Sequence, residues 1–144
     1  IMLSFKGISE KILPGAVAGV DCAAIFAFAP KSVVLGLIFG TVGQVIGLLG
    51  LIVFKSPIFL IPGFIPLFFD NATIAIFANK FGGWKAAAII CTVNGIVQIF
   101  GSMLVIKMTG LTWWQGSADY ATVWLGITFI LKIIGQMLGI PVAA

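Results

Sequence analysis

The stretch that decides the fold is IPGFIPLFFDNATIAIFANK, residues 61–80, because it is the second copy of a motif that occurs earlier in the chain. The first copy is ILPGAVAGVDCAAIFAFAPK, residues 12–31. Both contain Pro-Gly and then the pattern D-x-A-x-I-x-x-F-A-x-K, and a Thr-Val pair follows each copy, at 41–42 and at 92–93. We interpret this as an internal repeat of about fifty residues. Duplicated apolar units with Pro and Gly breaks at matching places are typical of the binding region of a transporter.

The composition is typical of a membrane protein. Apolar residues make up 61% of the chain and charged residues 8%, whereas a soluble domain carries about a quarter charged residues. The net charge of +4 comes from lysines that stand singly between apolar runs, so it indicates no nucleic-acid patch. Such lysines are expected where segments end at lipid headgroups. The sequence therefore predicts an all-α polytopic membrane protein.

Two uncharged runs, Ser32–Phe54 and Ala86–Ile106, are predicted to be spanning helices, because about 20 apolar residues cross a bilayer. Residues 120–144 are expected to hold a further spanning helix, from Tyr120 to Ile140, although Lys132 interrupts it. We expect an amphipathic interfacial segment at 1–11 and a connection at 107–119. Because the chain begins at Ile1 without an initiator Met, we expect a portion of a longer protein.

The apolar runs that precede the two spans contain helix breakers. Pro14-Gly15 and Pro30 interrupt the first, and Pro57, Pro62 and Pro66 interrupt the second. Interior prolines remove a backbone donor, so we expect no regular helix over 56–69. We predict two repeat units, 12–54 and 56–106, each a broken hairpin followed by a spanning helix. We favour re-entrant hairpins, which would invert the second unit relative to the first; hairpins that cross fully would make the units parallel.

The first span carries five glycines on one face, at 36, 40, 43, 47 and 50. Small residues at this spacing let a second helix approach closely. We therefore expect these glycines to serve packing and not to contact a ligand.

The main candidates for solute contact are the carboxylate of Asp21 and the backbone at Gly63, Phe64 and Ile65. Asp21 could accept hydrogen bonds from a polyhydroxylated solute or cap a half-helix, and both interpretations stay open. The prolines around Gly63 could expose backbone groups to a ligand or only turn the chain. The secondary candidates are Cys22, Asp70, Asn71 and Gln44.

The secondary candidates each have a structural interpretation. For Asp70 we favour a helix cap. For Gln44, Asn94 and Gln98 we favour hydrogen bonds between helices over a polar pathway. Cys22 and Cys91 lie far apart in apolar runs, so we interpret them as small buried residues.

The chain lacks the residues of an enzyme. It has no histidine and no phosphate-binding loop, and no cluster of potential metal ligands is present in the sequence. We therefore expect no catalytic residue, no metal and no cofactor.

Several motifs, in one order, are shared with a known family. They are LPGAV (13–17), DCAAI (21–25), FAP (28–30), PGFIP (62–66), NATI (71–74), FAN (77–79) and FGGW (81–84). This set resembles the ascorbate-specific enzyme IIC membrane subunit, the permease, of the bacterial phosphotransferase system. The resemblance covers residues from about 7 to about 120 and fades to general hydrophobicity beyond Tyr120.

The resemblance implies that the chain is the C-terminal portion of a homodimeric α-helical transporter with inverted repeats in the bacterial inner membrane. It places ligand contacts at Asp21 and at the turn formed by Gly63, Phe64 and Ile65. The rest of the site would lie in the part of the family that this chain does not contain. Cytoplasmic IIA and IIB components would supply the phosphoryl group.

We therefore expect part of a permease that moves L-ascorbate inward by alternating access, coupled to phosphorylation by IIB. One alternative is an ion-coupled secondary transporter of a small polar solute. The other is a structural membrane subunit without a pathway.

Overall fold

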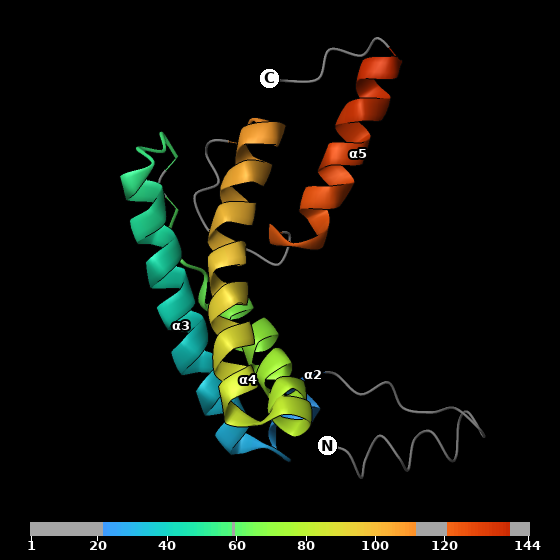
Figure 1. Cartoon of the computed structure of the whole chain (residues 1–144). Coiled ribbons are helices and arrows are strands. Elements are labelled where there is room, and N and C mark those ends of the chain that lie inside the picture. The colour runs from blue at the N-terminus through green and yellow to red at the C-terminus, as the bar shows by residue number, and fades with distance from the viewer. Residues whose placement is uncertain (1–21, 59, 112–120, 139–144) are drawn as a thin grey trace, which may run out of the picture.

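The computed structural model describes residues 22–58, 60–111 and 121–138 (Figure 1). In these ranges the elements are four helices: α2 (Cys22–Phe26), α3 (Pro30–Val53), α4 (Phe64–Thr109) and α5 (Val123–Met137). The predicted all-helical fold is confirmed for this part of the chain. The interfacial segment expected at 1–11, and most of the first broken element, lie outside the described residues.

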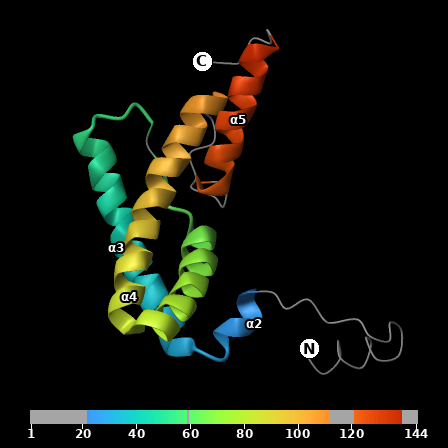
Figure 2. The same cartoon turned by 45° about the vertical axis from the view of Figure 1, so that its right-hand side comes forward.

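Helix α4 is two arms joined by a sharp turn. Gly83, with φ 73° and ψ −177°, is non-helical and separates the first arm (64–82) from the second arm (84–109). Figure 2 shows the arms folding back on each other beside α3. The turn lies at the Gly82-Gly83 pair of the FGGW motif.

Helix α3 has clear start and stop signals. Pro30 is its first residue, where a missing N–H costs nothing. At the other end Lys55 takes a left-handed φ of 50°. Its N–H donates to Ile52 O, and that of Ser56 donates to Leu51 O. These two bonds form a Schellman motif, and Pro57 then prevents the helix from continuing.

The expectation of no regular helix over 56–69 is wrong from Phe64 onward. Helix α4 begins at Phe64 with Gly63 as its N-cap, so Pro66 is its third residue. The N–H of a third helical residue has no acceptor within the helix. The first i to i−4 hydrogen bond of α4 runs from Leu67 N to Gly63 O, at 3.3 Å. Pro66 is therefore compatible with the first turn, and only the chain before Gly63 is irregular.

The glycine face of α3 packs against both arms of α4. A Cβ at Gly36 would collide with the Asn71 carbonyl, one at Gly43 with the Thr92 carbonyl, and one at Gly47 with Ile99. Conversely, a Cβ at Gly95 would collide with the Gly40 carbonyl. These contacts confirm that the glycines serve close packing.

The contacts also give the direction of each segment. Along α3, Ser32 contacts Asn79 and Gly40 contacts Leu67, so the first arm runs antiparallel to α3. Gly43 lies at Thr92 and Gly50 at Phe100, so the second arm runs parallel to it. Figure 1 shows the same directions.

This arrangement corrects the inverted relation favoured for the two units. The second broken element begins beside Leu51, which clusters with Leu60, and ends beside Ser32, so it runs the length of α3 and does not return at half depth. The two spans that follow the motif copies, α3 and the second arm, are parallel. This is the arrangement expected for broken elements that cross fully.

The core changes in character along α3. Leu51, Leu60, Ile99 and Ile106 form an apolar cluster near its C-terminal end. Small residues, Ala75, Ala87 and Cys91, form a second cluster nearer the hairpin. Between them lies a group of buried amide side chains, described in the next subsection. The fully buried amide side chains are therefore concentrated at one level of the bundle.

The two motif copies fold differently at matching positions. The second copy is helical throughout Asp70 to Lys80. In the first copy, α2 ends at Phe26 and α3 starts at Pro30. Pro30 stands where the second copy has Asn79, and a proline at this place cannot continue the preceding helix. The copies differ at five of the eleven positions from Asp to Lys, and Pro30 is the difference that directly opposes a continuous helix.

The outer surface of the bundle is apolar. Val53, Phe54, Phe81 and Ile89 are among many large apolar side chains that are mostly exposed. Helices α3 and α4 are long and apolar enough to cross a membrane. Helix α5 packs along the end of α4 and has 15 residues, fewer than the about 20 needed to span.

Substitution of Gly43 by Ala tests the packing face. A methyl group there would collide with the Thr92 carbonyl, and overpacking of this kind costs about 1–3 kcal/mol. We expect a lower apparent melting temperature of the detergent-solubilised full-length parent protein, measured by size exclusion after heating. Gly126→Ala is the control, because a Cβ at Gly126 meets nothing within 4 Å. Equal stability of the two variants would contradict the packing role.

Substitution of Gly83 by Ala tests the turn. A Cβ at Gly83 meets no atom within 4 Å, so any effect comes from the backbone conformation, which is essentially restricted to glycine and costs other residues about 1–3 kcal/mol. We expect a lower melting temperature for Gly83→Ala. Gly110→Asn is the control, since Gly110 has φ 70° and ψ 10°, a conformation that Asn tolerates. Comparable losses in both variants would contradict a special strain at Gly83.

Candidate functional site

The carboxamide of Gln98 is the centre of the polar level of the bundle. Its Oε1 accepts hydrogen bonds from Gln44 Nε2 at 3.0 Å and from Asn71 Nδ2 at 3.4 Å. Its Nε2 donates to Asp70 Oδ2 at 3.0 Å and to the Pro66 carbonyl at 3.3 Å. A primary amide has two donor hydrogens and two acceptor lone pairs. All four are used.

We call Gln98 and the four side chains joined to it the amide network. The four are Gln44, Asp70, Asn71 and Asn94. Asn94 Nδ2 donates to Asn71 Oδ1 at 3.2 Å. Gln44, Asn71 and Gln98 are at most 2% exposed. The network therefore connects α3, the first arm and the second arm inside an apolar bundle, where an unpaired amide would be costly.

Gln44 and Asn71 were secondary candidates for solute contact, and their amides are engaged within the protein. Gln44 donates a hydrogen bond to Gln98 of another helix, as expected from the interpretation that favoured bonds between helices over a polar pathway. A Cβ at Gly40 would collide with the Asn71 side chain, so the absence of a side chain at Gly40 makes room for this amide. Both residues fix helices relative to each other.

Asp70 is not a helix cap, which corrects the interpretation favoured from the sequence. It is the seventh residue of α4, whose N-cap is Gly63. It is half-buried, and its carboxylate accepts the hydrogen bond from Gln98. Because Pro66 was expected to prevent a helix, the sequence predicted a helix start close to Asp70. The helix begins earlier, at Phe64, so Asp70 lies inside it.

The turn at Gly63, Phe64 and Ile65 lies next to the network. Gly63 has φ −80° and ψ 128°, an ordinary extended conformation. The side chains of Phe64 and Ile65 are exposed, and their N–H groups are at the start of a helix, where no intrahelical acceptor exists. The positive end of the α4 dipole is therefore directed at this turn.

The first motif copy approaches the second through aromatic contacts. The Phe26 ring of α2 lies 5.3 Å from that of Phe68, edge to face, and 6.0 Å from that of Phe69. Phe64 stacks on Phe68 at 5.9 Å. Asp21 lies just outside the described residues, and Cys22 is the first residue of α2. The helix that follows Asp21 in the chain thus packs near the Gly63 turn.

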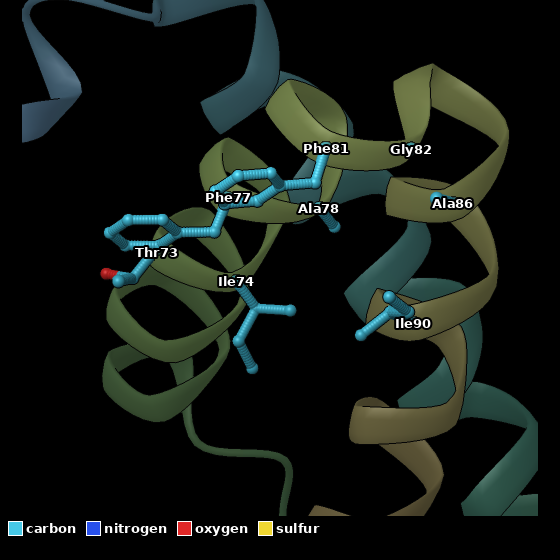
Figure 3. A pocket seen from close by; sticks show the side chains of 8 residues that line it. All are labelled: Thr73, Ile74, Phe77, Ala78, Phe81, Gly82, Ala86 and Ile90. Atoms are coloured by element: carbon cyan, nitrogen blue, oxygen red, sulfur yellow. The ribbon is translucent and has the colours of Figure 1, made fainter.

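A separate groove of about 530 Å³ lies between the two arms near the hairpin. Figure 3 shows that Phe77, Phe81 and Ile74 line it from the first arm and Ala86 and Ile90 from the second. Its one polar side chain, Thr73, donates its hydroxyl hydrogen to the Phe69 carbonyl of its own helix. This apolar groove contains no candidate site residue and does not suit a polar solute.

From the sequence, hydrogen bonds between helices were favoured over a polar pathway for Gln98 and Asn94. The central position of Gln98 was not predicted. The available signal was weak: two amides four residues apart on an uncharged span. The Pro66 carbonyl, which Gln98 also binds, gives no sequence signal because any residue carries that group. Its position depends on the packing of the two arms.

The fold and composition define the class first: a helical membrane domain with buried polar side chains. Comparison with known proteins adds the family. Residues 1–137 match the family described as "PTS system sugar-specific permease component", EIIC-GAT, of the phosphotransferase system (PTS). The chain belongs to this family. The description of this family is that of a permease component and not of a phosphoryl-transfer enzyme.

One curated relative is the "Ascorbate-specific PTS system EIIC component" of Mycoplasma pneumoniae (strain ATCC 29342 / M129 / Subtype 1). It is 39% identical over an alignment of 106 residues, and the match covers 67% of this chain and 16% of the relative. The chain thus matches about a sixth of the length of that protein.

Substitution of Asn71 by Ala tests the amide network. It would leave the Asn94 amide without its acceptor and remove a donor to Gln98, and a buried group left unsatisfied costs about 1–3 kcal/mol. We expect a lower melting temperature of the detergent-solubilised parent protein. Asn79→Ala is the matched control on the same arm, since Asn79 donates to Ser32 at the hairpin end, away from the amide network, and is partly exposed. An Asn79→Ala loss as large as that of Asn71→Ala would count against the network.

Proposed function

We propose that the chain is part of a permease that moves L-ascorbate inward across the bacterial cytoplasmic membrane. A separate IIB component, which receives its phosphoryl group from IIA, phosphorylates the solute. The observation that supports this proposal best is the 39% identity to an ascorbate-specific EIIC component, together with motifs that resemble that family at both repeat copies. Family membership supports the coarser statement that the chain is a sugar-specific permease domain.

The proposed solute contacts are Asp21 and the backbone of Gly63, Phe64 and Ile65. Asp21 directly precedes α2 in the sequence, and α2 packs its Phe26 ring on Phe68 of the first arm. The helix start at Phe64 presents N–H groups that lack intrahelical acceptors. A carboxylate acceptor near backbone donors suits a solute with several hydroxyl groups and an anionic enolate oxygen.

The rest of the site is proposed to lie in other parts of the parent protein. The chain matches 16% of the length of its relative, and all four hydrogen-bonding positions of Gln98 are used within the protein. We propose a homodimer that works by alternating access. The apolar outer faces of α3 and α4 would then contact lipid or the remainder of the parent protein.

Uptake of labelled L-ascorbate by membranes that contain the full-length parent with IIA and IIB tests this function. We expect Asp21→Asn to reduce uptake at least tenfold, because one interaction with an ionised group contributes about 1.5–3 kcal/mol. Asp70→Asn should retain much of the uptake, since an amide oxygen can still accept the hydrogen bond from Gln98.

Matched expression of the three proteins is the control. Equal uptake by the wild type and Asp21→Asn would contradict the proposed contact. A wild type that takes up no ascorbate, with both partners present, would refute the proposed substrate and leave the family assignment standing.

A further inference from the structure

The first turn of α4 lacks the usual local support for a helix start. Its N-cap is Gly63, which has no side chain to accept a hydrogen bond from the turn, and no side-chain cap is present. Pro66 contributes no N–H. Helix starts commonly depend on a capping side chain, so the position of this turn must be fixed in another way.

Gln98 of the second arm does not cap the N–H groups of this turn, but it holds the beginning of α4 by donating to acceptors there. Its Nε2 donates to the Pro66 carbonyl at 3.3 Å and to Asp70 Oδ2 at 3.0 Å. Residues four apart lie on the same face of a helix, one turn above the other. A single NH2 group therefore bonds two successive turns at the beginning of α4 and ties them to the opposite arm.

The orientation of the Gln98 amide is fixed as well. Its oxygen accepts from Gln44 and Asn71. Rotation of the amide by 180° would place its NH2 group against these two donors and its oxygen against two acceptors. Gln44 on α3 and Asn71 on the first arm thus ensure that the donors of Gln98 face the start of α4.

We propose that Gln98 is a positioning residue for the solute-binding turn: it fixes Gly63, Phe64 and Ile65 relative to the second arm without contacting the solute. Gln98 is 1% exposed, so it acts through Pro66 and Asp70. This inference rests on the proposed function, because that function makes the turn a solute contact. A small displacement of binding groups can lower the efficiency of a site up to about a hundredfold.

The test compares Gln98→Met with Ser102→Ala in the full-length parent protein. Met has a similar length to Gln and removes all four hydrogen bonds. Ser102 is the matched control: it lies one turn further along the same arm, is fully buried, and its hydroxyl has no hydrogen-bond partner among the described residues. Gln44→Met is a milder variant, for use if Gln98→Met does not fold, because it keeps Gln98 and removes one orienting donor.

Two measurements are made on each variant. Hydrogen exchange followed by mass spectrometry reports the peptide that covers residues 63–70. Uptake of labelled L-ascorbate reports KM and the maximal rate per transporter. For Gln98→Met we expect exchange at 67–70 to accelerate about tenfold and KM to rise about tenfold, with the maximal rate within about twofold. Gln44→Met should shift both in the same direction by less, and Ser102→Ala should shift neither.

Unchanged exchange in a folded Gln98→Met protein would overturn the proposal, because the turn would then be held by other contacts. Accelerated exchange with an unchanged KM would also overturn it, since the turn would not matter for solute binding. Hydrogen exchange needs no solute, so it still tests the link between Gln98 and the turn if the wild type proves not to transport ascorbate.

Discussion

The structure depends on how closely α3 can approach the two arms of α4. In a membrane, helices gain little from apolar burial and associate through close packing and hydrogen bonds. Gly36, Gly40 and Gly43 allow backbone contact with Asn71, Gly95 and Thr92. This proximity brings Gln44 within 3.0 Å of Gln98. The buried hydrogen bonds are therefore a consequence of the missing side chains on α3.

The amide network in turn gives the packing a defined register. Apolar side chains tolerate small shifts along a helix axis, whereas a set of paired donors and acceptors does not. A slip of α3 by one residue would separate Gln44 from Gln98 and cost the buried Gln44 amide this partner. Buried polar groups are known to specify one arrangement in some other helical assemblies. Here the same bonds also reach the start of α4, at Pro66 and Asp70.

Sequence patterns predicted those features that depend on local chemistry. The span at α3 and the glycine face followed from an uncharged run and a regular spacing. The start of α4 was missed because Pro66 breaks a helix interior but fits a first turn. Gln98 was underrated because its partners depend on how three segments pack. Asp70 was mistaken for a cap because the helix was expected to start after Pro66, whereas it already begins at Phe64.

The parallel course of α3 and the second arm has a topological consequence. The segment from the end of α3 to the end of the second arm travels the length of the bundle and back again. A unit with an even number of crossings returns the chain to the side from which it left. Such a unit can be duplicated or removed without reversing the sidedness of anything downstream, whereas a unit with an odd number reverses it. If a unit of this kind were duplicated in tandem, no redistribution of lysines would be needed to keep later segments correctly oriented.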